Sequence, residues 1–238
     1  MNPLTGAARL GIVGGTGPES TIDYYRKAIA RWRAVRPDGT YPEIVVSSVD
    51  GGTVIANLGA GAFDEVGRTF GNALVGLDAA GCDLALIASN AGHLAFDHLD
   101  PAPQIPMLHM VEATLDVARR AGHRRLGIIG TRFVVRSDLY PSRFGPAGIE
   151  IVTPAETELS VVHDIYLGEL VEGVLLDDSR QRIVDVIATM RDRDGIDGVI
   201  LGGTELALTL TAPSYADVRI LDTARIHVEA AIDRLAGI

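Results

Sequence analysis

Short apolar runs alternate with longer amphipathic stretches along all 238 residues of the chain. The apolar runs are almost uninterrupted, which is typical of parallel strands that are covered on both faces. In the stretches between them apolar residues recur at three- and four-residue spacing, as in Ile183, Val186, Ile187 and Met190, and this spacing predicts helices. The alternation predicts a doubly wound α/β fold. We expect strands at 10–13, 43–48, 84–88, 107–108, 127–129, 150–152, 199–201 and 219–221, helices at 21–34, 70–80, 111–121, 161–171, 178–193 and 224–235, and loops at 51–64 and 212–217.

Two sequence patterns occur twice and in the same order. Residues 9–16 (RLGIVGGT) recur at 125–131 (RLGIIGT), and residues 83–90 (DLALIASN) recur at 197–204 (DGVILGGT). The offsets are 116 and 114 positions, which predicts two similar doubly wound parallel-sheet lobes related by internal pseudo-symmetry. The N-terminal lobe is expected over 1–110, completed by a C-terminal helix at 222–238. The C-terminal lobe is expected over 111–221.

Composition excludes several classes of function. The net charge of −10 disfavours a nucleic-acid partner, because an acidic surface repels phosphate. No apolar run reaches the roughly 20 residues that span a bilayer, and the N-terminus does not resemble a signal peptide. One cysteine, Cys82, allows no internal disulfide and fits a cytoplasmic protein. The only lysine, Lys27, lies on a predicted helix, which disfavours pyridoxal phosphate, and we expect no cofactor.

Polar residues follow the predicted strands of the first half, at the sheet edge where open α/β proteins bind ligands. A glycine-rich turn leads from the first strand to Thr16, where backbone N–H groups can approach an anion. Asp50 follows the second strand as either a pocket residue or a turn residue. The segment 89–93 (SNAGH) follows the third strand, and its hydroxyl, amide and N–H groups can hold a carboxylate. Alternatively, it is a polar turn that caps a helix.

The corresponding cluster of the second half is 202–205 (GGTE). Thr204 can donate a hydrogen bond to an acid, and Glu205 is either a desolvated general base or a helix-start residue. His93, His109 and His227 lie near three different strand ends, where a histidine can move protons near neutral pH. We expect no metal site, because neither H-E-x-x-H nor a helical two-histidine spacing occurs.

Taken together, these motifs resemble the aspartate/glutamate (Asp/Glu/hydantoin) racemase family of cofactor-independent amino-acid racemases. The resemblance covers the whole chain and rests on short motifs at 14–18 (GGTGP), 48–50 (SVD), 89–93 (SNAGH), 105–109 (IPMLH), 202–205 (GGTE) and 221–223 (LDT), followed by His227. It implies two similar α/β lobes with the active site in the cleft between them, and a homodimer. It also implies two cysteine thiols that exchange a proton with opposite faces of the substrate α-carbon.

This chain departs from the family pattern at both thiol positions. Ser89 replaces the first cysteine and Gly203 the second. Glycine has no proton to give, and a serine hydroxyl is a poor base unless a neighbour activates it. Ala91 and Val134 also stand where relatives have threonines that bind carboxylate, whereas Asn90 and Thr204 are retained.

The resemblance and these departures lead us to expect an enzyme that acts on a small carboxylate or carbonyl compound. One-sided proton transfer, as in an isomerase, decarboxylase or lyase, needs fewer groups than racemisation. The substrate would be bound by Asn90, Thr204 and the N–H groups of Thr16 and Ala91, with Val134 nearby and room beside Gly203. Ser89, Asp50, His93 and Glu205 are the candidate catalytic residues. The alternatives are a true racemase that uses non-thiol bases and a non-catalytic protein that binds small molecules.

Overall fold

The computed structural model of the protein describes residues 8–238. Within this range the chain forms two compact units. Unit 1 contains the described residues up to His109 together with His227–Ile238, and unit 2 contains Met110–Ile226. No helix in the described range is long and apolar enough to cross a membrane.

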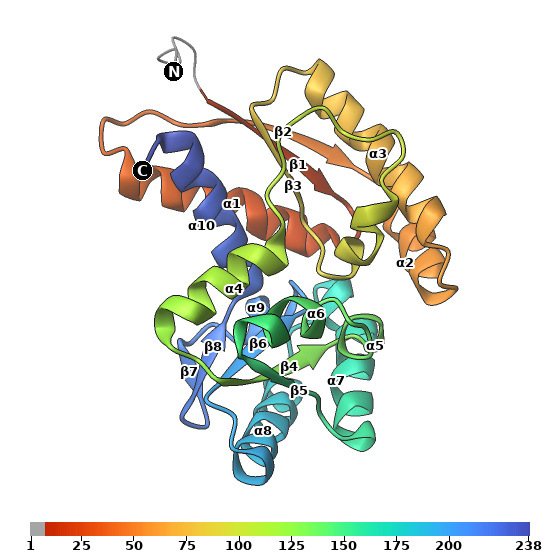
Figure 1. Cartoon of the computed structure of the whole chain (residues 1–238), viewed down its shortest axis with the longest axis vertical. Coiled ribbons are helices and arrows are strands. Elements are labelled where there is room, and N and C mark those ends of the chain that lie inside the picture. The colour runs from red at the N-terminus through yellow and green to blue at the C-terminus, as the bar shows by residue number, and fades with distance from the viewer. Residues whose placement is uncertain (1–7) are drawn as a thin grey trace. The chain divides into compact units, whose positions relative to one another are not determined.

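The sheet of unit 1 has three parallel strands in the order β2-β1-β3 (Figure 1). They are β1 (Arg9–Gly14), β2 (Glu43–Ser48) and β3 (Leu84–Ile87). The register pairs Gly14 with Ser48 and Val13 with Ile87, so the three strands end at one common edge. The strand expected at 107–108 is reduced to a single parallel bridge between Met107 and Ala85.

Helices cover both faces of this sheet because the chain leaves β1 in one direction for β2 and returns past β1 to reach β3. Right-handed crossovers in opposite directions place α1 and α3 on opposite sides of the strands (Figure 1). The helices are α1 (Pro18–Val35), α2 (Gly51–Gly59), α3 (Phe63–Ala79), the 3₁₀ helix η1 (Ala91–His98) and α10 (Thr223–Ala236), which belongs to unit 1 from His227 onward.

The loop expected at 51–64 is wrong, because helix α2 occupies most of it. Asp50 caps this helix by accepting hydrogen bonds from the N–H groups of Gly52 and Thr53. The two glycines and the β-branched residues that begin α2 have low helix propensity, and the cap offsets it. Helix α3 begins at Phe63, earlier than expected and directly after the short turn that follows α2, and it has no side-chain cap.

The sheet of unit 2 has five strands in the order β5-β4-β6-β8-β7. Strands β4 (Arg125–Gly130), β5 (Glu150–Val152), β6 (Gly198–Gly202) and β8 (Val218–Leu221) are parallel, and β7 (Ser214–Tyr215) pairs antiparallel with β8. Its first three strands thus have the order seen in unit 1. The predicted α/β fold with parallel sheets is confirmed. The loop expected at 212–217 contains β7 and a tight turn at Ala216 and Asp217, both with positive φ.

The main core of unit 2 lies between two long helices and strands β6 and β8, and Leu201 shares one buried cluster there with Val162, Ile165, Ile183 and Ile187. The helices of unit 2 are α4 (Met110–Ala121), α5 (Arg132–Val135), α6 (Pro141–Phe144), α7 (Glu156–Gly168), α8 (Asp177–Asp194) and α9 (Leu206–Thr209), and the 3₁₀ turns are η2 (Gly145–Ala147) and η3 (Leu170–Glu172).

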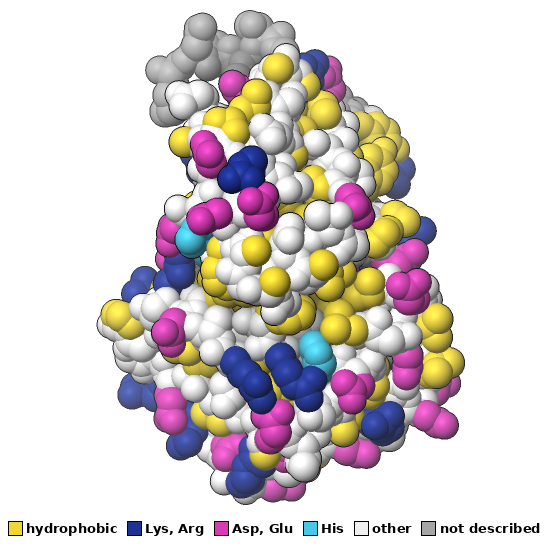
Figure 2. Space-filling model, turned by 90° about the vertical axis from the view of Figure 1, so that its right-hand side faces the viewer, with side chains coloured by type: hydrophobic (Ala, Val, Ile, Leu, Met, Phe, Trp, Pro, Cys, Tyr) yellow, Lys and Arg dark blue, Asp and Glu magenta, His cyan; other side chains and the backbone are white. Residues whose placement is uncertain are grey.

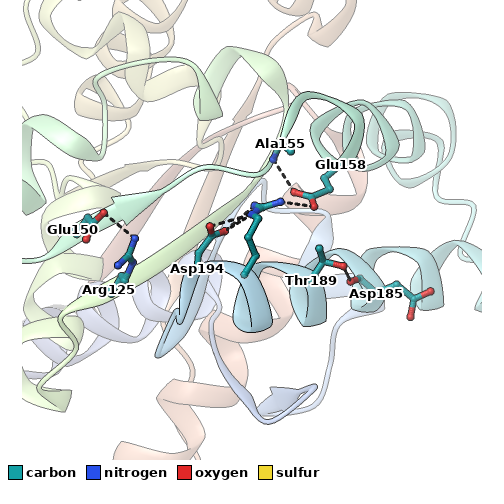
Figure 3. Close-up of polar contacts among 8 residues, drawn as sticks. Arg125, Glu150, Ala155, Glu158, Asp185, Thr189 and Asp194 are labelled. Atoms are coloured by element: carbon teal, nitrogen blue, oxygen red, sulfur yellow. Dashed lines mark hydrogen bonds and ion pairs between the residues drawn. The ribbon is translucent and has the colours of Figure 1, made fainter.

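The start of α7 is fixed by a polar network rather than by apolar spacing (Figure 3). Glu158 accepts a hydrogen bond of 2.7 Å from the N–H of Ala155, and the Arg193 guanidinium of α8 bonds to both Glu158 and Asp194. The helix therefore begins five residues earlier than the expected range 161–171 and ends at Gly168.

Figure 2 shows acidic and basic side chains interspersed on one face of the molecule.

Candidate active site

The carboxyl ends of the strands carry the candidate residues in each unit. We call the edge formed by Thr16, Asp50 and 89–93 in unit 1 the serine edge. The edge formed by Thr131, Val134 and 203–205 in unit 2 is called the glycine edge. Each edge is described separately, from the strand ends outward.

At the serine edge, β1 turns sharply into α1 through Gly15, whose φ of +94° favours glycine. A Cβ at this position would overlap the carbonyl oxygen of Val49, so the close approach also requires glycine. The N–H of Gly15 donates to the Thr21 hydroxyl at 2.9 Å. This N–H is thus occupied within the turn, and the half-buried Thr16 is the next residue able to meet an anion.

Ser89 follows β3 and is 6% exposed. Its hydroxyl oxygen accepts a hydrogen bond of 3.1 Å from the N–H of Gly92, so it caps the first turn of η1. A hydroxyl that accepts one bond still has its own hydrogen to donate. Asn90 is buried and Ala91 is half-buried beside it. Ser89 therefore combines the capping role with one remaining donor.

Three histidines cluster in unit 1. The ring of His93 lies 4.7 Å from that of His109 and 5.7 Å from that of His227, between ring centroids. His93 Nδ1 donates to the carbonyl oxygen of Ser89 at 2.7 Å, because a carbonyl can only accept. In the neutral ring the lone pair is then on Nε2, which is the nitrogen that can take up a proton.

His227 is fully buried, and its neighbours fix its tautomer. Nε2 donates to the carbonyl oxygen of Leu108 at 2.9 Å, so Nδ1 accepts from the Tyr24 hydroxyl at 3.1 Å. Burial, and secondly the nearby His93, lowers the pKa of His227 to about 3. His227 is thus neutral at physiological pH and supports the cluster without carrying charge.

Asp50 is exposed and serves as the cap of α2. One carboxylate oxygen accepts from the N–H groups of Gly52 and Thr53, and the other accepts from the Thr53 hydroxyl at 2.6 Å. The Thr53 hydroxyl, followed by these N–H groups, lowers the pKa of Asp50. Asp222 has a similar part at the end of β8, where it accepts from the N–H of Arg225 at 3.0 Å. Asp50 therefore has the turn role that the sequence offered as one of its two alternatives.

The glycine edge begins where β4 and β6 end side by side. Gly130 pairs with Gly202, and a Cβ at Gly130 would lie 2.7 Å from the carbonyl oxygen of Gly202. Thr131 follows directly and is 4% exposed, yet its hydroxyl has no hydrogen-bond partner among residues 8–238. Val134 is buried one turn further on, in α5. A buried hydroxyl without a partner is uncommon, and it marks this edge as a place for a polar ligand.

Beyond β6, a buried carboxylate lies between two hydroxyl groups. Glu205 is 2% exposed, and its Oε2 accepts from the Thr204 hydroxyl at 2.9 Å and from the Tyr166 hydroxyl. Tyr166 comes from α7 and is 8% exposed. Burial, and secondly the Glu205 charge, raises the pKa of Tyr166 well above its usual value. This tyrosine is consequently a neutral donor to the carboxylate.

The sequence did not single out Tyr166 or Thr131. In the sequence Tyr166 looks like one more apolar residue on the buried face of a helix. Its polar contact becomes visible only in the structure, where its hydroxyl donates to Glu205. Thr131 stands in the second copy of the repeated pattern RLGI(I/V)G, at the place of the residue that precedes Thr16. That correspondence was a signal available in the sequence.

The remaining reactive side chains lie elsewhere. Cys82 is buried at the amino end of β3, the opposite end from Ser89, and burial raises the pKa of its thiol. Lys27 forms an ion pair with Asp23 one turn away on α1. Across the described part of the chain, no three His, Cys, Asp or Glu residues are grouped so that they could hold a metal ion.

The fold and these edges define a class of protein: an α/β protein whose parallel sheets end in buried polar clusters suited to a small polar molecule. The chain belongs to the Asp/Glu/Hydantoin racemase family, whose model matches residues 13–231. The family resemblance seen in the sequence is thereby confirmed.

Individual relatives agree with this assignment. The chain is 30% identical to a candidate Asp/Glu racemase of known structure from Yersinia pestis, with a TM-score of 0.83 over 96% of this chain and 99% of that one. It is 32% identical to an aspartate racemase homologue from Pyrococcus horikoshii OT3, with a TM-score of 0.79 over 97% and 99%. It is 25% identical to the broad specificity amino-acid racemase RacX of Bacillus subtilis over 60% of this chain, and that match spans 63% of RacX.

Proposed function

We propose that this protein is an enzyme that transfers a proton, without a cofactor, at the carbon next to the carboxylate or carbonyl of a small substrate. The transfer would be one-sided, as in an isomerase, decarboxylase or lyase, rather than racemising. The substrate class is supported by the family and by the relative RacX, which is an amino-acid racemase of broad specificity.

The observation that carries the proposal is the placement of the only thiol. Cys82 lies at the amino end of β3, whereas Ser89 follows the carboxyl end of the same strand. No thiol is therefore available at the serine edge, and Gly203 provides none at the glycine edge. Racemisation by two opposed thiols needs one on each face of the substrate, so this chain requires a different distribution of acid and base.

Each edge, taken by itself, offers hydrogen-bond donors for a carboxylate. Asn90 and the turn N–H groups at Thr16 and Ala91 would serve at the serine edge. At the glycine edge the donor would be the buried hydroxyl of Thr131, which has no partner among the described residues. The Thr204 hydroxyl expected to bind the substrate already donates its one hydrogen to Glu205. Donors that are fixed before the reaction stabilise the negative charge of an enolate as it forms. His93 and Glu205 are buried and are the stronger base candidates, whereas the carboxylate of Asp50 is engaged in capping.

Proton NMR in deuterated water tests the proposal. The purified protein is mixed with amino acids, alkyl- and arylmalonates and small keto acids, and the α-proton signal and configuration are followed. We expect deuterium exchange with retention of configuration, or loss of carbon dioxide. Exchange with inversion would establish a racemase that uses non-thiol bases. Ligand-induced shifts without any exchange would establish a binding protein instead.

A pair of matched variants examines the binding role of Thr131. Thr131→Val removes a buried hydroxyl without a partner among the described residues, so it should stabilise the free protein by about 1 kcal/mol and weaken substrate binding about tenfold. Thr114→Val is the control, because that buried hydroxyl already donates to the carbonyl of Met110 at 2.8 Å. The control should not affect binding. Unchanged binding by Thr131→Val would remove Thr131 from the site.

A further inference from the structure

Gly203 is glycine for reasons of space. Its φ lies outside the left-handed region, so any residue could adopt its backbone conformation. A Cβ at this position, however, would overlap Cε2 of Tyr166 and lie 2.8 Å from its Cζ and 3.0 Å from its hydroxyl oxygen. The ring of Tyr166 therefore occupies the volume into which any side chain at position 203 would project.

The Tyr166 hydroxyl is directed to one carboxylate oxygen. It donates to Glu205 Oε2, the oxygen that also accepts from Thr204 at 2.9 Å. All three side chains are at least nine-tenths buried. They come from two elements, α7 and the turn after β6, which are fixed to each other by the core of unit 2.

A purely structural link between α7 and this turn does not require a carboxylate. Phenylalanine at position 166 and an apolar residue at position 205 would fill the same volume without placing a charge in the core. A buried carboxylate, in contrast, carries a large desolvation cost. Glu205 also lies at the carboxyl end of a central parallel strand, where ligands of this fold class bind. Its position and its buried hydroxyl partners together favour a chemical role.

We propose that Tyr166 and Glu205 form a proton relay at the glycine edge, where the Tyr166 ring fills the volume that a side chain at position 203 would take. This inference rests on the proposed function and names the proton-handling group of that activity. In the forward step the bond between carbon and the α-proton breaks, and the proton moves to the tyrosine oxygen. The original hydroxyl proton moves at the same time to Glu205 Oε2, and the electron pair stays on the substrate as an enolate. The reverse step returns a proton to carbon and restores the Glu205 carboxylate.

The relay assigns a separate part to each of the three residues. Tyr166 touches the reacting carbon and is a catalytic residue. Glu205 is the proton store, and it also holds the hydroxyl of Tyr166 in one orientation. Thr204 is a positioning residue, since its hydroxyl supports the same carboxylate oxygen. The phenol stays neutral before and after each step, in keeping with the raised pKa of Tyr166.

Exchange kinetics on any acid for which the wild-type protein exchanges the α-proton test the relay. Tyr166→Phe and Glu205→Gln should each lower kcat for exchange about 100-fold or more and change KM little, because general acid–base groups contribute about that much. The double variant should be no slower than the slower single variant, since both residues act in one step. Tyr215→Phe is the matched control, because its hydroxyl accepts from the N–H of Ala212 and lies outside the glycine edge. It should exchange at the wild-type rate.

A second substitution removes the ambiguity of a misfolded variant. Incorporation of 3-fluorotyrosine at position 166 keeps the ring and its packing but makes the phenol more acidic. The exchange rate should change severalfold, whereas a purely structural tyrosine would leave it unaltered. A wild-type protein that exchanges no substrate overturns the proposed function and the relay together. Wild-type exchange that persists at full rate in folded Tyr166→Phe overturns the relay alone.

Discussion

The serine edge and the glycine edge follow strands of the same order, β2-β1-β3 and β5-β4-β6, yet they present functional groups in different ways. At the serine edge the polar group belongs to Ser89, two residues after the end of β3, and its hydroxyl also caps the next helix. At the glycine edge the corresponding residue has no side chain, and a hydroxyl arrives from α7 instead. Equivalent backbone positions therefore do not predict equivalent chemistry, because a missing side chain can be replaced from another element.

The largest effect should come from placing a thiol at each edge. Gly203→Cys should lower the free energy of unfolding by about 1–3 kcal/mol, because the new side chain overlaps the ring of Tyr166. Ser89→Cys should cost about 1 kcal/mol or less, since only one hydrogen bond from Gly92 is weakened. Urea unfolding followed by far-ultraviolet circular dichroism measures both changes.

A double-mutant cycle tests whether the overlap with Tyr166 causes the difference. Tyr166→Ala removes the ring, so Gly203→Cys should be tolerated much better in that background than alone. The two substitutions should be non-additive by about 1 kcal/mol or more. Strict additivity would mean that another group restricts position 203. The same overlap means that the double variant Ser89→Cys with Gly203→Cys is not expected to restore thiol-based racemisation by itself. The Tyr166 ring would have to move or be removed to make room for the second thiol.

The parallel strands of both sheets were predicted from the sequence because most of them are largely apolar runs. The strand expected at 107–108 is only a single bridge, and the short strand β7 was missed. The helix α2 was missed, because its stability depends on the Asp50 cap more than on the helix propensity of its residues. Ser89 and Gly203 could be recognised from the repeated motifs. Tyr166 could not, since its role depends on a partner 39 positions away and on the volume that a glycine leaves. Volume of this kind is a tertiary property and has no signature in local spacing.

The two units should also respond differently to acid. Burial lowers the pKa of His227 to about 3. Below about pH 6.5 this ring therefore binds less proton in the folded protein than in the unfolded chain. Its contribution to stability is present above pH 6.5 and is lost as the pH falls towards 3, by at most about 1.4 kcal/mol per pH unit. The only tryptophan, Trp32 of α1, is buried in unit 1 and reports its unfolding by fluorescence.

His227→Gln provides the comparison for that acid response. The glutamine amide can still donate to the carbonyl of Leu108, but it does not titrate. The variant should be less stable than the wild type at pH 7, and its stability should fall less between pH 6.5 and pH 5. An equal fall in both proteins would assign the acid sensitivity to other groups.

The smallest predicted effect is the loss of thermal stability on substitution of Asp50. The same variants test whether the catalytic base lies at the serine edge or at the glycine edge. Asp50→Ala should lower Tm by about 2 °C through loss of the α2 cap, and Asp50→Asn should change Tm less, because asparagine also caps. Neither substitution should alter α-proton exchange, since the carboxylate is committed to Gly52 and Thr53. Loss of exchange in Asp50→Ala, with exchange retained in Tyr166→Phe, would instead place proton transfer at the serine edge.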